Sequence, residues 1–189
     1  MPNSFNTLLD PAIELQTQCC NHIKLRLVSP DDASFILKIR LDEELNRHIS
    51  SVENDLEKQM EWIVNYKERE LHGSEFYFII TLDEGLPLGT VRLYDFQQDS
   101  FCWGSWVILK NAPVYAGIES ALSIYELAFY KLGFKQSHFD VRKENSKVIK
   151  FHENFGAKKV SEDLEIFNFI YRKESYEKIK HKYKKYLKS

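Results

Sequence analysis

Three cysteines, five prolines and seven glycines are few for a chain of 189 residues, and each scarcity excludes a class of protein. The low glycine and proline content excludes a collagenous or low-complexity chain. Three cysteines are too few for a disulfide scaffold. No apolar run approaches the ~20 residues of a membrane-spanning helix, and the first residues lack the pattern of a secretory signal. We therefore expect a single folded domain in the cytoplasm, with reduced cysteines and no membrane span.

Two of the cysteines, Cys19 and Cys20, are adjacent. A disulfide between neighbouring residues would be strained, so we expect both to be free thiols. Together with His22 they provide three metal-ligating side chains, but no fourth ligand follows at a suitable spacing. The sequence therefore predicts no metal site.

Charge is unevenly distributed along the chain. The formal net charge is −2, yet residues 173–189 contain seven lysines and only two glutamates. A nucleic-acid-binding domain would be basic overall, so we expect no nucleic-acid partner. Within this tail, Tyr176, Ile179, Tyr183 and Leu187 recur at near-heptad spacing. The pattern predicts an amphipathic helix that docks on the body of the protein or on a second copy in a homodimer.

Strand and helix patterns alternate between residues 23 and 172 without an internal repeat or a linker. Apolar alternation or continuous apolar runs predict strands at 23–27, 76–82, 88–95, 101–109, 137–142, 157–160 and 165–172. Apolar residues at a 3.6-residue period predict helices at 30–42, 55–71, 118–132 and 146–155, with a short helix near 12–17. We predict an N-terminal extension over 1–21, one α/β domain over 22–172 and a basic helix over 173–189.

The segment 110–117 joins the strand at 101–109 to the next helix and could bind a phosphate group. A helix N-terminus presents unpaired backbone N–H groups and a partial positive charge. Gly117 would let the backbone approach an anion closely. A plain connecting loop explains the same residues equally well, so both interpretations stay open.

The helix at 146–155 places His152 on the same face as Val148, Phe151 and Phe155, through i, i+3, i+4 and i+7 spacing. This face should contact the sheet, so His152 is either a core residue or an acid/base group in a cleft. Asn145 precedes the helix and has a simple explanation as its N-cap.

These two segments and the order of elements resemble the GNAT superfamily of acyl-CoA-dependent N-acetyltransferases, over residues 23–172. The most specific match is N-S-K-V-I-K-F-H-E-N-F-G-A at 145–157. From Trp106 to Gly117 the chain also matches, without a gap, the family's stretch from the fourth strand to the last glycine of the pyrophosphate loop. The resemblance implies a mixed, mostly antiparallel central sheet of about seven strands flanked by helices, plus the C-terminal helix.

The resemblance also implies acetyl transfer from acetyl-CoA to a primary amine of a small molecule. The implied cofactor-binding positions are Trp106, Val107, Ile108, Tyr115, Ala116, Gly117, Ile118, Glu119, Asn145 and Lys150. His152 matches the position of the family's usual acid, which protonates the departing thiolate, and a pKa near neutrality would suit that role. No acid on the strand at 101–109 could serve as the base, which leaves Tyr94, Asp95 and His138 as candidates.

The loop departs from the family pattern at two positions. Ala112 stands where the family has Arg or Gln, and Tyr115 stands where it has its first glycine. Backbone N–H groups can still bind phosphate, so weaker cofactor binding is the expectation. A non-catalytic acyl-CoA-binding domain is the alternative from another functional class.

Substrate specificity is indicated by I-R-L-D-E-E-L-N-R at 39–47, which resembles a segment of GNAT enzymes that acetylate nucleotide-linked amino sugars. It resembles polyamine and protein N-terminal acetyltransferases less well. Arg40 suits an acceptor that carries phosphate or carboxylate, and Tyr94 and Trp103 complete the predicted substrate site. Trp103 and Trp106 could stack on a ring of the substrate, but in a central strand tryptophans are more often core residues.

Overall fold

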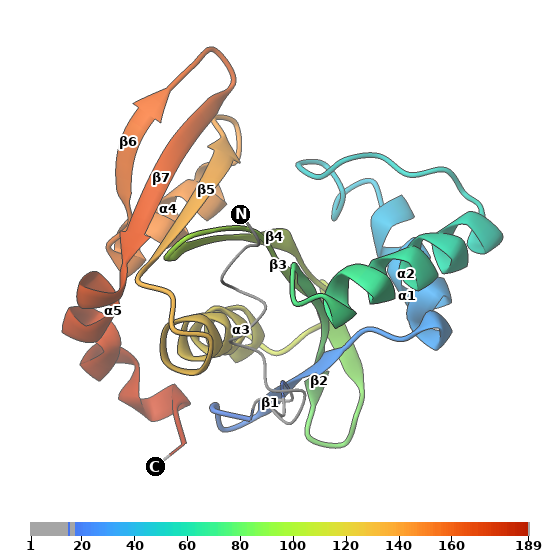
Figure 1. Ribbon diagram of the computed structural model, residues 1–189, viewed down its shortest axis with the longest axis horizontal. Helices are drawn as coiled ribbons and strands as arrows, with labels where there is room; N and C mark the ends of the chain where they lie inside the picture. The colour runs from blue at the N-terminus through green and yellow to red at the C-terminus, as the bar shows by residue number, and fades with distance from the viewer. Residues whose placement is uncertain (1–14, 16–17, 189) are drawn as a thin grey trace.

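A seven-stranded sheet organises the chain, and the structure, a computed structural model, describes Leu15 and residues 18–188 of it (Figure 1). The strands are β1 (Ile23–Leu27), β2 (Phe76–Leu82), β3 (Pro87–Gln97), β4 (Ser100–Ile108), β5 (Gln136–Arg142), β6 (Lys158–Glu162) and β7 (Ile166–Arg172). They run in the order β1-β2-β3-β4-β5-β7-β6, and only β4 and β5 are parallel. The expected α/β class with a mostly antiparallel sheet of about seven strands is confirmed.

The helices cover both faces of this sheet. They are α1 (Ala33–Leu41), α2 (Leu56–Leu71), α3 (Tyr115–Glu126), α4 (Ser146–Phe155) and α5 (Lys173–Lys180). A 3₁₀ turn, Pro30–Asp32, precedes α1, and a π-helical turn, Leu127–Lys131, continues α3. The expected helix near 12–17 falls, apart from Leu15, outside the described residues. None of the described helices is long and apolar enough to cross a membrane.

A separate hydrophobic cluster lies on each face of the sheet. The larger cluster contains side chains from the strands β1 through β5 and β7 and from the helices α3, α4 and α5. Phe101, Tyr125 and Phe169 belong to it. The smaller one joins α1 and α2 to the opposite face of β2 through Ile36, Ile63 and Ile79. In Figure 1, α1 and α2 accordingly lie on one side of the sheet and α3 on the other.

The apolar period of α2 identified the helix but not its buried face. Ile63 is buried together with Gln59 and Tyr66, whereas Leu56, Met60 and Val64 are about half exposed. The aromatic side chains of this helix make the contact instead, because Tyr66 stacks near Trp62 and its hydroxyl accepts the backbone N–H of Tyr77 at 2.7 Å. Leu71, which the period also includes, is 86% exposed at the end of the helix.

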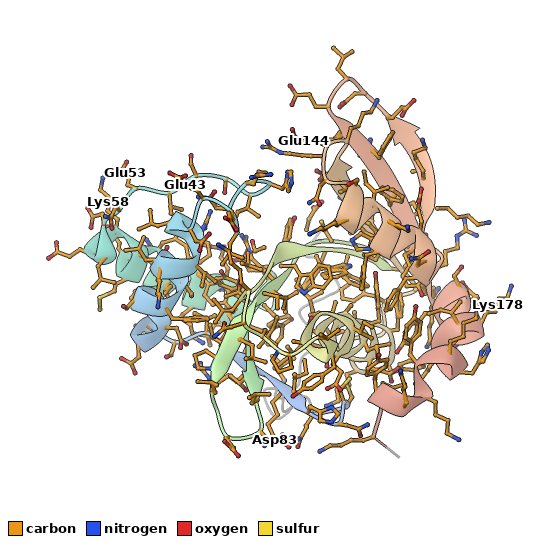
Figure 2. The ribbon with its side chains drawn as sticks, turned by 180° about the vertical axis from the view of Figure 1, so that it is seen from behind. Glu43, Glu53, Lys58, Asp83, Glu144 and Lys178 are labelled. Carbon is orange, nitrogen blue, oxygen red and sulfur yellow. The ribbon has the colours of Figure 1, made fainter. Side chains whose placement is uncertain are left out.

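The basic tail docks on the body of this same chain. Tyr176 is fully buried and its hydroxyl donates to the Glu126 carboxylate, while Lys180 forms an ion pair with the same carboxylate at 2.6 Å. A 3₁₀ helix, His181–Tyr186, follows α5, and Leu187 then pairs with Cys20. The apolar stripe predicted from the sequence therefore covers α3, while Lys178 projects away from the body, as Figure 2 shows.

Candidate active site

The parallel strands β4 and β5 separate after a short contact and open a cleft between them. They pair only at Ser100–Gln136 and Phe101–Ser137. A bulge in β4 accompanies the divergence, since Val91 alone lies opposite Ser105 and Trp106. Ser105 has a φ of 46°, and its carbonyl accepts the Thr90 hydroxyl at 2.9 Å. The resulting cleft of about 1190 Å³ exceeds the roughly 300–1,000 Å³ of typical small-molecule sites, so it has room for two substrates.

One end of the cleft contains five of the predicted cofactor-binding residues. They are Trp106, Val107, Ile108, Gly117 and Asn145. The Trp106 indole N–H donates to the Ser120 hydroxyl on α3 at 3.0 Å, which fixes the ring against the helix start. A Cβ added at Gly117 would meet only Trp106, at 3.8 Å, so an open approach to the backbone remains there. Asn145 also caps α4, because its side chain accepts the Val148 N–H at 3.3 Å.

The other predicted cofactor-binding side chains lie outside this cleft. Tyr115 stacks on His22, with ring centroids 4.3 Å apart. Glu119 is fully buried and accepts the backbone N–H groups of His22 and Ile23 at 3.0 and 3.2 Å. Its side chain therefore anchors the start of β1, which leaves only the backbone at this position for the predicted cofactor contact.

The side chains of three further predicted positions also lie outside the cleft. Ala116 is buried and Ile118 packs against the core. Lys150 is exposed and does not line the cleft, whereas Lys147 does. The two lysines lie three residues apart on α4, so a short distance along the sequence separates a cleft residue from a surface residue.

His152 lines the middle of the cleft and is 4% exposed. Aromatic rings surround it, with centroids at 4.2 Å for Phe139 and 5.4 Å for Trp103. Burial lowers the pKa of its imidazole to about 3, so the ring is neutral at pH 7. The expected pKa near neutrality is thus wrong for this environment. Nδ1 is buried and has no hydrogen-bond partner among the described residues, which leaves one polar atom available to a ligand.

The three predicted substrate residues, Arg40, Tyr94 and Trp103, also line the cleft. Arg40 and Tyr94 lie near Arg92, and we call this part of the cleft the acceptor end. Trp103 lies instead beside His152 and Trp106, with ring centroids at 5.4 and 5.2 Å. Arg40 donates to the carbonyl and hydroxyl oxygens of Ser50, at 2.9 and 2.8 Å. Burial raises the pKa of Tyr94 and raises that of the neighbouring Cys102 to about 11. Both groups are therefore uncharged at neutral pH.

Two of the candidate bases form a separate cluster. His138 Nε2 lies 3.0 Å from Asp95 Oδ2, and its Nδ1 lies 2.6 Å from the Ser100 hydroxyl. Neither Asp95 nor His138 lines the cleft, although Tyr94 does. The carboxylates that do line it are Glu44 and Asp140. Of these, Glu44 is bound by Lys110 at 2.8 Å.

Sequence reasoning missed several charged residues that line the cleft. They are Arg92, Asp140, Arg142 and Lys147. Arg92 and Asp140 could have been noticed, because each interrupts an apolar strand pattern with a charge. The structure brings them together from β3 and β5, and no local sequence pattern specifies that meeting.

The segment between α1 and α2 crosses the mouth of the cleft. Its Glu44 pairs with Lys110 on the loop after β4, and His48 Nδ1 lies 3.8 Å from a Glu144 carboxylate oxygen on the loop before α4. In Figure 2, Glu144 projects from the β5–α4 side toward the segment that carries Glu43. The two contacts connect this segment to both walls of the cleft.

Comparison with known proteins gives a consistent result. The family model described as "Acetyltransferase (GNAT) domain" matches residues 22–158. A solved structure described as apo FdhC, a nucleotide-linked sugar GNAT, is 48% identical, covers 89% of this chain and 97% of its own, and superposes with a TM-score of 0.83. No curated protein matches the chain significantly.

More distant structures share the fold. A spermidine N-acetyltransferase from Vibrio cholerae, in complex with CoA and spermine, is 15% identical, covers 82% of this chain and 97% of its own, and has a TM-score of 0.69. A probable acetyltransferase is 17% identical, covers 84% of this chain and 97% of its own, and has a TM-score of 0.71. At these identities the likeness concerns the fold alone.

Proposed function

The chain belongs to the GNAT family of acetyltransferases, and from that premise we propose that it transfers an acetyl group from acetyl-CoA to the amino group of a nucleotide-linked sugar. The observation that carries the proposal is the 48% identity to a nucleotide-linked sugar GNAT over nearly the whole of both chains. The resemblance of the segment at 39–47 supports the same acceptor class.

The residues at the Gly117 end fit acetyl-CoA. The first turn of α3 offers backbone N–H groups, and the dipole of the helix favours an anion there. Beyond Phe101, the edge of β4 that faces β5 has no strand partner among the described residues, so its backbone groups can bind an extended ligand chain. The wall at Trp106 and Val107 is largely apolar. Acetyl-CoA supplies the activated thioester.

His152 has a role other than the one expected of a charged acid. A neutral imidazole still carries one N–H and one acceptor nitrogen, so it can donate a hydrogen bond or relay a proton without becoming charged. Its place between Trp103 and Phe139 lies midway between the two ends of the cleft. We place His152 at the reacting groups on this basis, as a neutral hydrogen-bonding residue.

The charge of the acceptor end argues against a polyamine. Arg40 and Arg92 line it, and a polycationic acceptor would be repelled by both guanidinium groups. A nucleotide-linked sugar carries negative charge away from its amine and would be attracted.

The test is a comparison of acceptors with the purified protein. Release of free CoA thiol from acetyl-CoA is measured with a nucleotide-linked amino sugar, the same amino sugar without its nucleotide, spermidine and a peptide with a free N-terminus. We expect kcat/KM to be at least 100-fold higher for the nucleotide-linked sugar than for spermidine. Preference for spermidine or the peptide would refute the proposal. Binding of CoA by calorimetry without turnover of any acceptor would indicate the non-catalytic alternative.

A further inference from the structure

The acceptor end of the cleft has more cationic than anionic groups in direct contact. Arg69 Nε and Arg92 Nη2 both bind the Glu75 carboxylate, at 2.9 and 2.5 Å. Glu75 is buried, with 7% of its side chain exposed, and its single charge is shared by two guanidinium groups. The indole ring of Trp62 lies 5.5 Å from each of these guanidinium groups, which fixes both cations in place.

The positive charge of Arg40 is balanced by even less negative charge nearby. Its guanidinium group donates to the neutral carbonyl and hydroxyl oxygens of Ser50, and no carboxylate among the described residues lies within ion-pair distance. Burial and the nearby charge of Arg92 both lower the pKa of the Arg40 guanidinium. The fold therefore holds a partly buried cation near a second one, and an anion bound between them would stabilise both.

Both arginines also have an unused donor. The Nε atoms of Arg40 and Arg92 are buried and have no hydrogen-bond partner among the described residues. Buried polar atoms are normally satisfied, so two unpaired guanidinium donors in one cleft indicate a ligand. The planar donor fork of arginine fits the paired oxygens of a phosphate group.

We propose that Arg40 and Arg92 bind the diphosphate group of the sugar nucleotide, an inference that rests on the proposed function. Arg69 and Arg92 share the Glu75 carboxylate, and Arg40 pairs with no carboxylate among the described residues. These three guanidinium groups therefore carry more positive charge than the one carboxylate that they contact can balance, and the diphosphate ester of a sugar nucleotide is negatively charged. The cleft then binds one diphosphate at each end, that of CoA near Gly117 and that of the acceptor near Arg92. The sugar amine and the thioester meet between them, beside His152.

The first test measures binding without any acyl transfer. Uridine diphosphate, thymidine diphosphate and inorganic pyrophosphate are titrated calorimetrically into the full-length protein, with CoA present so that the Gly117 end is filled. We expect the parent to bind at least one nucleoside diphosphate, and Arg40→Gln and Arg92→Gln each to weaken that binding 10- to 100-fold. Arg47→Gln is the matched control, because Arg47 is exposed and does not line the cleft, and it should change affinity less than twofold.

Arg92→Gln also removes a contact to Glu75, so it could act through folding. Arg40→Gln breaks no ion pair and provides the independent test, and thermal melts of both variants identify any loss of structure. The inference is overturned if the parent binds none of the three probes, or if folded Arg40→Gln and Arg92→Gln bind them as the parent does.

The second test separates this inference from the proposed function. With a nucleotide-linked amino sugar, the two variants should raise the acceptor KM at least tenfold, while KM for acetyl-CoA stays within twofold. With the corresponding free amino sugar, parent and variants should have the same kcat/KM. If the parent acetylates the nucleotide-linked sugar but the variants leave its KM unchanged, the diphosphate site is wrong and the function stands. If the parent prefers a non-nucleotide acceptor, the proposed function is wrong.

Discussion

Replacing His152 with phenylalanine tests whether this histidine is buried in its neutral form. The imidazole has an ordinary pKa of 6.5, and burial lowers it to about 3 in the folded protein. In the unfolded chain the same ring titrates near 6.5. Between these two values the unfolded state binds a proton that the folded state does not. The free energy of unfolding therefore falls as the pH is lowered from 6.5 toward 3.

The size of the effect follows from the two pKa values. Each pKa unit corresponds to about 1.4 kcal/mol, and pH 5 lies about 1.5 units below the unfolded pKa. His152 should thus remove about 2 kcal/mol of stability between pH 7 and pH 5. His152→Phe lacks the titrating group, so its stability should fall by about 2 kcal/mol less over the same interval. Any change in packing caused by the larger ring is present at both pH values and cancels.

The assay is urea unfolding followed by tryptophan fluorescence, at pH 7 and pH 5, for parent and variant. His72→Phe is the matched control for replacing an exposed histidine, because His72 lies at the end of α2 and does not line the cleft. A difference below about 0.5 kcal/mol between parent and His152→Phe would refute the buried, neutral assignment. The same assignment predicts that kcat shows no step from His152 between pH 6 and pH 8.

Three further predictions concern the cofactor end, the tail and the bulge. Gly117→Val should weaken CoA binding roughly tenfold in calorimetry, about 1.4 kcal/mol. Gly117→Ala should not weaken it, since the added Cβ would make only an ordinary contact with Trp106. Equal CoA affinities of parent and Gly117→Val would contradict the placement of CoA at this end. Deleting residues 174–189 removes the fully buried Tyr176, whose burial stabilises the fold by about 3–5 kcal/mol. The deletion should therefore lower Tm by roughly 6 °C or more. An unchanged Tm would show that the tail does not stabilise the fold. Thr90→Val removes the hydrogen bond to the carbonyl of Ser105 in the β-bulge. It should lower the free energy of unfolding in urea by about 0.5–1.5 kcal/mol, and it should lower kcat. Values equal to those of the parent would mean that this bond does not hold the bulge.

Local signals in the sequence predicted the elements well where caps mark the ends. The helix expected at 146–155 has those bounds in the structure, because Asn145 caps its start and Gly156, with a φ of 94°, ends it. It was harder to predict which side chains of a helix line the cleft. Glu119 follows Gly117 by two residues, which is about 200° around the helix, so one lines the cleft and the other anchors β1. Treating 115–119 as one continuous binding segment therefore included side chains that point away.

Some residues come together only because of the order of the strands in the sheet, and local sequence signals could not predict them. Arg92 on β3 and Asp140 on β5 are separated by nearly fifty residues and face the same cleft. Their meeting depends on the parallel contact of β4 with β5 and on the bulge that ends it. No period or motif within either strand contains that information. Arg40 was predicted because a recognisable local segment surrounds it, and Arg92 was missed because none does.

The same burial that shapes the centre of the cleft also restricts its chemistry. His152 and Cys102 are shifted in opposite pKa directions, yet both are shifted toward their uncharged forms, as is Tyr94. A low-dielectric centre suits a neutral amine and a neutral thioester. An amine that arrives as an ammonium ion must therefore lose its proton before it reaches this centre. Asp140 is one of the carboxylates that line the cleft, so we expect proton removal to depend on Asp140 rather than on His152.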